Sequence, residues 1–264
     1  MRTAYVFVAL FIALTIVPAV ATAQINFPKT GYVAALGDSV AAGDGALPVT
    51  NGYAYDLYTR GIFGRMQETE FSNAALRGAR SWDLRDHQVP QVLCAENAQR
   101  PTVVTITTGA NDFLRGDVDI VSIALRVAES VNLLLNNGSV FVASPVLDPV
   151  TFTPCRALGG VTILVSNYYS IPHPIPIVAA QLDAALQGFD QALRFWLQFV
   201  HVPAGSRVAV VDLYTPSLDR QGLVTIERRL GITGPGPLDF DVHPTNVGHA
   251  FIAKQFEMTW NGLN

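Results

Sequence analysis

Apolar and β-branched residues gather in five short runs along the chain, and polar residues interrupt these runs only rarely. Runs of four to eight apolar residues without polar alternation are typical of strands that are buried on both faces of a parallel sheet. We predict strands at Tyr32 to Leu36, Phe71 to Leu76, Thr102 to Thr107, Val161 to Val165 and Arg207 to Leu213.

Between these runs, apolar positions recur every three or four residues, which is the period of an amphipathic helix. We predict helices at Tyr53 to Met66, Val118 to Leu135, Val178 to Val200 and Gly248 to Trp260. Strands that alternate with helices predict an α/β fold. The expected architecture is a three-layer sandwich, in which helices flank a central parallel sheet of about five strands.

One part of this pattern is ambiguous. Ser139 to Val146 is a second candidate for the fourth central strand, but we favour Val161 to Val165 because a long helix and then a strand follow it directly. Leu147 to Gly160 and Ser170 to Pro176 then become irregular connections rich in proline and apolar residues. They are either walls of a substrate pocket or ordinary surface loops packed on the sheet.

The N-terminus has the features of a secretory signal. Arg2 precedes an apolar run from Val6 to Val17, and Ala21-Thr22-Ala23 offers a cleavage site of small residues. We expect removal of residues 1–23, one domain over residues 24–264, export to the extracellular space or periplasm, and no stable membrane insertion afterwards. The alternative is an uncleaved membrane anchor, because the apolar stretch just reaches the roughly 20 residues that span a bilayer.

Composition narrows the class of protein. Half of the 264 residues are apolar and 14% are charged, which suits one globular domain with a sizeable core. The formal net charge is -4, and the only lysines are Lys29 and Lys254. We therefore expect no nucleic-acid partner, since phosphate backbones require a basic surface. We expect a monomer.

Cys94 and Cys155 are the only cysteines. In an oxidising compartment they can form a disulfide, and the alternative is two buried thiols that fill the core. Neither has a neighbouring His or Cys at zinc-ligand spacing, so we expect no metal and no cofactor.

Four short segments carry candidate chemistry, each at the predicted end of a strand or before the last helix. They are Leu36-Gly37-Asp38-Ser39-Val40, Asn73-Ala74-Ala75-Leu76-Arg77-Gly78, Gly109-Ala110-Asn111-Asp112 and Asp241-Val242-His243-Pro244. A nucleophilic serine needs a base, a group that orients the base, and donors for the developing oxyanion. The carboxyl ends of parallel strands meet at one edge of a sheet, where such groups can assemble.

In this order, the four segments resemble the sequence blocks of the GDSL/SGNH hydrolase superfamily, over roughly Tyr32 to Phe256. The resemblance implies an SGNH-hydrolase fold, similar to flavodoxin, and makes Ser39 the nucleophile and His243 the base. It also implies an oxyanion hole formed by the N–H groups of Ser39 and Gly78 and the side chain of Asn111. Asp38 would have a structural role in the family.

The orienting acid departs from the family pattern. The usual acid lies three residues before the histidine, where this chain has Phe240. We assign the role to Asp241, while Asp239 and a backbone carbonyl near Phe240 remain open. The last option would give a Ser-His dyad, which is also known in the superfamily.

The resemblance implies a serine ester hydrolase. No G-x-S-x-G, H-E-x-x-H or P-loop motif is present in the sequence, which argues against other hydrolase classes. The substrate is a small-molecule or lipid ester, or alternatively an acetylated glycan. Apolar connection residues slightly favour an acyl chain: Phe152, Leu158, Tyr168, Tyr169, Ile171 and Ile175. An acyltransferase or a non-catalytic binding protein on the same fold are the other classes.

Overall fold

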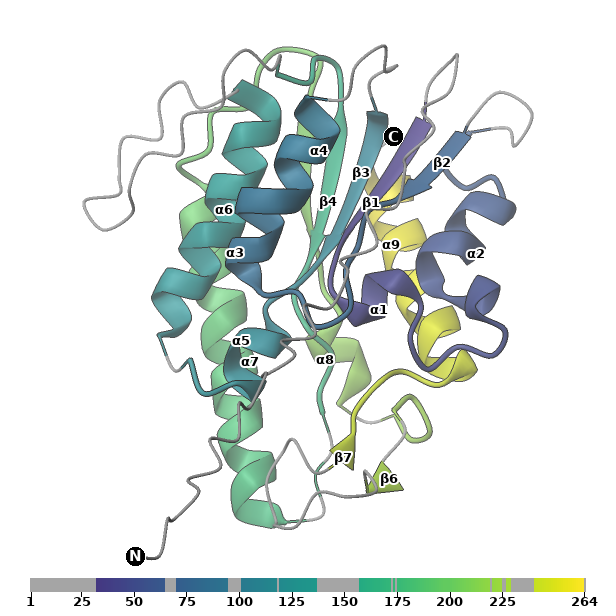
Figure 1. Ribbon diagram of the computed structural model, residues 1–264, viewed down its shortest axis with the longest axis vertical. Coiled ribbons are helices and arrows are strands. Elements are labelled where there is room, and N and C mark those ends of the chain that lie inside the picture. The colour runs from purple at the N-terminus through teal and green to yellow at the C-terminus, as the bar shows by residue number, and fades with distance from the viewer. Residues whose placement is uncertain are drawn as a thin grey trace, which may run out of the picture.

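The computed structural model of the chain is shown in Figure 1. It describes residues 32–64, 70–94, 101–117, 119–136, 157–171, 173, 175–218, 220–224, 227–228 and 240–263. The predicted signal peptide, the alternative strand from Ser139 to Val146 and residues 147–156 lie outside the described residues.

A five-stranded parallel sheet forms the centre of the molecule, in the order β2-β1-β3-β4-β5. This confirms the predicted α/β fold and its five central strands. The strands are β1 (Tyr32–Gly37), β2 (Glu70–Asn73), β3 (Pro101–Thr107), β4 (Thr162–Ser166) and β5 (Arg207–Val211). The carboxyl ends of β1 and β3 are in register, with Gly37 paired to Thr107.

Helices cover both faces of the sheet (Figure 1). One layer contains α3 (Ser81–Asp83), a π-helical turn (Leu84–Gln88), α4 (Val89–Leu93), α6 (Ile120–Asn136) and α7 (Pro176–Leu197). The other contains α1 (Ser39–Ala42), α2 (Tyr53–Thr59) and α9 (Asn246–Leu263). Shorter elements follow strands or loops: a 3-10 turn (Val49–Asn51), α5 (Ala110–Leu114) and α8 (Tyr214–Ser217).

The core consists of two apolar clusters, one on each face of the sheet. Ala34, Leu36 and Ile106 belong to the cluster under α4, α6 and α7, whereas Ala35 and Leu164 belong to the cluster under α2 and α9. Successive side chains of a strand point to opposite faces. A strand covered by helices on both sides is therefore apolar at most positions, which is the pattern that predicted these strands.

β2 and β5 end two or three residues before their predicted ends, and larger differences from the predicted elements occur elsewhere. The helix expected to reach Met66 ends at Thr59, because Gly61 adopts a left-handed φ of +65° two residues later. The helical segment from Ser81 to Leu93 was not predicted, since it is broken into three pieces of five residues or fewer. A small antiparallel pair, β6 (Glu227–Arg228) and β7 (Phe240–Asp241), is too short to leave a sequence pattern.

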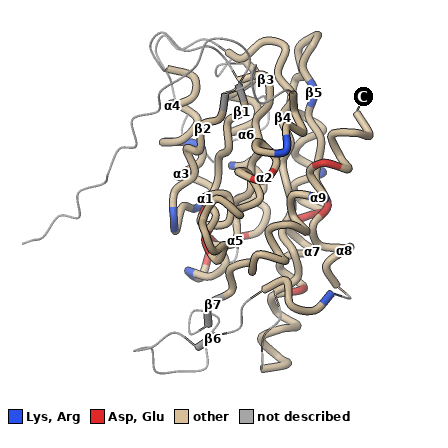
Figure 2. The backbone as a smooth tube through the Cα atoms, turned by 90° about the vertical axis from the view of Figure 1, so that its right-hand side faces the viewer, with Lys and Arg blue, Asp and Glu red and all other residues tan. Residues whose placement is uncertain are grey.

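Basic and acidic residues are scattered over the described part of the chain rather than gathered along one element (Figure 2). No helix in the described ranges is long and apolar enough to span a bilayer. Cys94 is disulfide-bonded. Cys155 lies outside the described residues, so its pairing with Cys94 stays a prediction.

Candidate active site

Ser39 lies at the turn between the central strand β1 and the short helix α1. Asp38 caps this helix, because its Oδ1 accepts the backbone N–H of Val40 at 3.0 Å. The cap turns the chain sharply at the carboxyl edge of the sheet. Ser39 thereby reaches the wall of a cavity although only 8% of the residue is exposed.

Gln88 holds the end of β1 from the side. Its side-chain Oε1 accepts the Gly37 N–H at 2.7 Å, and its Nε2 donates to the Gly37 carbonyl at 2.7 Å. The amide thus pairs with Gly37 as a neighbouring strand would. Gln88 is fully buried, so the residue that precedes the Asp38-Ser39 turn is fixed by the interior of the protein.

The Asp38 carboxyl group is enclosed below the serine. Its Oδ2 accepts the hydroxyl of Tyr168, and both side chains are buried. Burial raises the pKa of Asp38 to about 7, because a carboxylate loses its hydration in this position. Val40 and Tyr168 therefore account for both oxygens of this carboxyl group.

His243 meets Ser39 across the cavity. The distance from His243 Nε2 to Ser39 Oγ is 2.8 Å, which is a hydrogen-bond distance. The loop that carries the histidine is held by Tyr169, whose hydroxyl donates to the Val242 carbonyl at 3.1 Å. Residues 204 positions apart are brought together at this point.

Gly45 allows the turn after α1 to pack directly against the histidine loop. It has a φ of +88°, and a Cβ atom at this position would lie 2.2 Å from the Pro244 carbonyl oxygen and 3.0 Å from His243 Cβ. Both the backbone conformation and the contact exclude a larger residue. The turn that follows Ser39 and the loop that carries His243 are therefore in van der Waals contact.

Asp44 and His249 support the same junction. Asp44 Oδ2 lies 4.0 Å from His243 Nε2, and the Asp44 carbonyl oxygen lies 2.9 Å from His249 Nε2. His249 Nδ1 accepts the backbone N–H of Tyr53, so its Nε2 carries the hydrogen. Burial lowers the pKa of His249 and favours this neutral form.

The two predicted oxyanion donors follow the strands on either side of β1. Gly78 lies in the turn after β2 with a φ of +74°, and its N–H donates to no backbone carbonyl of the described residues. Asn111 lies in α5 after β3, and its Nδ2 donates one hydrogen to the Ala79 carbonyl at 3.0 Å. An amide nitrogen carries two hydrogens, so the second is available to a group in the cavity.

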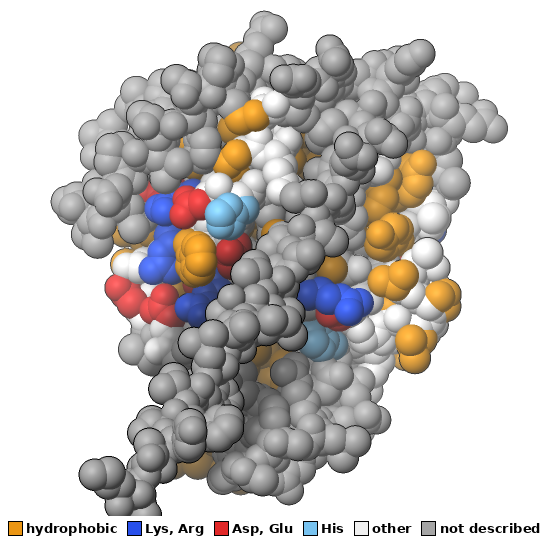
Figure 3. Space-filling view, in the orientation of Figure 1, with side chains coloured by type: hydrophobic (Ala, Val, Ile, Leu, Met, Phe, Trp, Pro, Cys, Tyr) orange, Lys and Arg blue, Asp and Glu red, His pale blue; other side chains and the backbone are white. Residues whose placement is uncertain are grey.

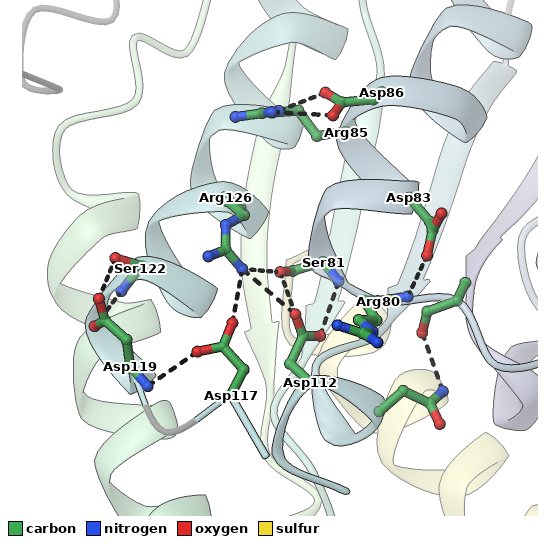
Figure 4. Close-up of polar contacts among 12 residues, drawn as sticks. Arg80, Ser81, Asp83, Arg85, Asp86, Asp112, Asp117, Asp119, Ser122 and Arg126 are labelled. Atoms are coloured by element: carbon green, nitrogen blue, oxygen red, sulfur yellow. Dashed lines mark hydrogen bonds and ion pairs between the residues drawn. The ribbon is translucent and has the colours of Figure 1, made fainter. Parts of the chain in front are cut away.

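Asp112, the neighbour of Asn111, faces Ser81 and Arg126 (Figure 4). Its oxygens accept the Ser81 N–H and the Ser81 hydroxyl, each at 2.8 Å, and Arg126 Nη1 lies 3.4 Å away. Burial raises the pKa of Asp112 despite these partners. Asp112 and Asn111 therefore have different roles. Asp112 connects α5 to α3 and α6, and this connection places Asn111 at the cavity.

The cavity has a volume of about 300 Å³. The residues predicted from the four sequence blocks share its wall: Ser39, Gly78, Asn111 and His243. Leu114, Ile171 and Val242 give it an apolar part. Its charged part contains two arginines, Arg77 and Arg115, and one carboxylate, Asp44. Three of the connection residues that the sequence suggested as pocket walls also line the cavity: Tyr168, Tyr169 and Ile171.

The prediction that the connection residues line a substrate pocket was wrong for Leu158. Leu158 is 1% exposed and packs in the core cluster under α6, because its N–H bonds to the Leu134 carbonyl and draws the connection toward that helix. Ile175 precedes α7 and does not line the cavity. Phe152 lies outside the described residues.

The orienting acid is not settled by the described residues. The backbone of Asp241 forms part of β7, but its side chain and the whole of Asp239 lie outside the description. The assignment to Asp241 stays a prediction. No group of three potential metal ligands occurs in the described part of the chain.

Sequence reasoning missed Gln88, Asp44 and Arg115. Nothing in the sequence around Gln88 distinguishes it from a surface residue, since its role depends on a π-helical turn. Asp44 had a detectable signal, a carboxylate in the glycine-rich turn that follows Ser39. Arg115 has no such signal, because it follows α5 and lies outside the Gly109-Ala110-Asn111-Asp112 segment.

Comparison with known proteins identifies the family of the chain. Residues 33–256 match the model of the GDSL-like lipase/acylhydrolase family. No curated protein sequence matches significantly.

Several solved structures share the fold at low sequence identity. An acetyl esterase variant with an acetate ion is 15% identical with a TM-score of 0.55, and covers 89% of this chain and 98% of its own. A carbohydrate esterase of family 3 from Talaromyces cellulolyticus is 16% identical with a TM-score of 0.54 and the same coverage. A lipase from a goat rumen metagenome is 18% identical with a TM-score of 0.51, covering 87% and 97%.

The match of the family model extends over most of the chain, and the similar structures include esterases and a lipase. The chain belongs to the GDSL-like lipase/acylhydrolase family and is an ester-hydrolysing enzyme.

Proposed function

We propose that the chain is a secreted serine esterase in which Ser39 attacks the ester carbonyl and His243 accepts its proton. The observation that carries this proposal is the distance of 2.8 Å between His243 Nε2 and Ser39 Oγ. A neutral imidazole at this distance takes the hydroxyl proton as the Oγ–carbon bond forms. Asp241 is our candidate for the group that holds the other ring nitrogen.

The negative charge of the tetrahedral intermediate falls on the former carbonyl oxygen. The N–H groups of Ser39 and Gly78 and the free amide hydrogen of Asn111 are the proposed donors to this oxygen. The imidazolium then donates its proton to the leaving alcohol, and an acyl-serine remains. Water, activated by the same imidazole, adds to this acyl group and releases the carboxylic acid.

The substrate we favour is an ester with a short acyl group. A cavity of about 300 Å³ lies at the lower end of the range for small-molecule sites, which is roughly 300–1,000 Å³. Its apolar part can accept a short chain. Acetylated carbohydrate is the second candidate, because an acetyl esterase and a carbohydrate esterase are among the structures of similar fold.

The test is a panel of p-nitrophenyl esters from acetate to palmitate, run beside acetylated xylan and pectin. We expect the highest kcat/KM at short chain lengths. Ser39→Ala and His243→Ala should each lower kcat by at least about 10⁴-fold. Ser130→Ala and His201→Ala are matched controls, since Ser130 bonds only within α6 and His201 is exposed.

Retention of activity in Ser39→Ala would reject the proposed nucleophile. Addition of glycerol to the assay separates hydrolysis from transfer, because a transferase would release glyceryl ester in place of the free acid. Secretion is tested separately: N-terminal sequencing of the exported protein should find Gln24 first, and a retained Met1 would reject it.

A further inference from the structure

Two arginines stand on the oxyanion side of the cavity. Arg77 precedes Gly78 in the turn after β2, and Arg115 follows α5, the helix that carries Asn111. Both side chains line the cavity that contains Ser39 and His243. The proposed hydrolysis of a neutral ester requires neither of them.

Arg115 lies directly over Gly78. A Cβ atom at Gly78 would be 2.8 Å from Arg115 Nη2 and 4.0 Å from its Cζ. The absence of a side chain at Gly78 therefore gives the guanidinium its place beside a proposed oxyanion donor. Within the described ranges, no carboxylate forms an ion pair with Arg115, although other arginines of the chain are paired.

Arg77 is held at one end only. Its Nε lies 2.7 Å from Asp44 Oδ1, while 74% of the side chain is exposed. Ion pairing through Nε leaves the two Nη groups for another partner. Asp44 lies 4.0 Å from His243 Nε2, so this ion pair keeps Arg77 at the same cavity as His243.

The local charge contrasts with that of the whole protein, whose formal net charge is -4. On the face seen in Figure 3, basic side chains lie beside acidic ones and a histidine, with apolar side chains to the right. A general attraction for anions is therefore not expected. Attraction for an anion is expected only at the cavity, where Arg77 and Arg115 lie.

We infer that the preferred substrate carries an anionic group, a carboxylate or a phosphate, within a few bonds of the scissile ester, and that Arg115 and Arg77 bind it. This inference rests on the proposed function of the same site. Guanidinium groups bind both kinds of anion in paired, charge-assisted hydrogen bonds. The anionic group can belong to the acyl or to the alcohol side of the ester, and the test separates these sources.

The experiment compares each charged ester with a neutral ester of similar shape. For the acyl side, mono-p-nitrophenyl glutarate is compared with p-nitrophenyl pentanoate. For the alcohol side, 4-acetoxybenzoate is compared with 4-acetoxybenzamide. The readout is the ratio of kcat/KM for the charged to the neutral ester, so a general loss of activity cancels.

We expect wild type to prefer the charged ester in one of the two pairs. In Arg115→Gln the ratio for that pair should fall about tenfold, and by a smaller factor in Arg77→Gln, because charge-assisted hydrogen bonds are lost. Arg115→Glu should push the ratio below one. Arg194→Gln, an equal charge change on α7, should leave the ratio unchanged. Salt should lower the ratio in wild type.

Equal ratios in wild type, Arg115→Gln and Arg115→Glu would overturn the inference. If these proteins still hydrolyse the neutral esters, the proposed function is not affected. Preference for the neutral ester in both pairs would also overturn it. If the wild type is as inactive as Ser39→Ala on both charged and neutral esters, the proposed function fails and the inference fails with it.

Discussion

The proposed nucleophile, Ser39, and the proposed base, His243, are held in place by different kinds of structure. Ser39 follows the central strand β1, and the groups around it, Gln88, Asp38 and Tyr168, are all buried. His243 follows the two-residue strand β7 and is held by contacts between loops, through Tyr169 and the Gly45 turn. Changes on the nucleophile side should therefore affect stability, whereas changes on the histidine side should affect activity first.

The largest effect should come from the histidine side. If Asp241 holds the Nδ1–H of His243, Asp241→Asn should lower kcat by about 10⁴-fold while the Tm stays close to that of wild type, because the imidazole is then held in the wrong tautomer. Asp239→Asn should change kcat little. Steady-state kinetics and thermal unfolding of both variants test this.

Two further outcomes would change the assignment. Loss of activity in Asp239→Asn alone would move the acid to that residue. Full activity in both variants would replace the triad by a Ser-His dyad that a backbone carbonyl orients.

On the nucleophile side, Asp38 should make stability depend on pH. Its pKa is 3.8 when unperturbed and about 7 in the folded protein, so the folded state retains a proton that the unfolded state loses. Its contribution is complete below pH 3.8 and is lost as the pH rises toward 7, by up to about 4 kcal/mol.

Asp38→Asn removes this titration and keeps the shape of the side chain. Urea unfolding at pH 4 and pH 7 should therefore show a smaller decrease in unfolding free energy for the variant than for wild type. Parallel pH curves would mean that Asp38 is ionised in the folded state.

Asn111 is the exception on the nucleophile side, because it lines the cavity and is proposed to donate to the oxyanion rather than to hold the end of β1. Asn111→Ala should lower kcat by about 10²- to 10³-fold with little change in KM, as expected for an oxyanion donor. Pre-steady-state and steady-state kinetics distinguish the cases: an effect confined to KM would make Asn111 a residue that binds the ground state.

Gln88→Leu should test the support of β1. The Gly37 N–H loses its partner in a buried position, which should lower the unfolding free energy by about 2 kcal/mol. Gln91→Leu is the matched control, because Gln91 is exposed on α4. Equal stability of the two variants in denaturant titration would show that water or a local shift replaces the Gln88 amide.

The smallest effect is expected from Tyr169→Phe, which removes only the hydrogen bond to the Val242 carbonyl. A net loss of about 1 kcal/mol corresponds to a roughly fivefold fall in kcat. Tyr214→Phe, another buried tyrosine, should not change kcat. If Tyr169→Phe lowers the Tm but leaves kcat unchanged, the proposed difference between the two sides is contradicted.

Prediction from the sequence succeeded for the fold, whose elements are set by residues that are neighbours in the chain. The β-strands were predicted because a strand covered on both faces is mostly apolar. Ser39, Gly78, Asn111 and His243 were expected at one site because each lies next to the end of a predicted element, and they line one cavity, while their roles stay predictions. Gln88 could not be predicted in this way, since its partner lies 51 residues away and its helix turn is irregular. Arg115 is equally hidden, because only the fold brings it over Gly78.

The separation of 204 residues between Ser39 and His243 has a consequence for folding. The proposed catalytic pair joins the loop before α9 to the turn after β1, and α9 itself packs on α2. Contacts between such late and early parts of the chain are slow to form. Enzymatic activity should therefore return after the sheet during refolding. During heating it should disappear before the sheet melts, because local undocking of α9 separates the two residues while the β-strands stay paired.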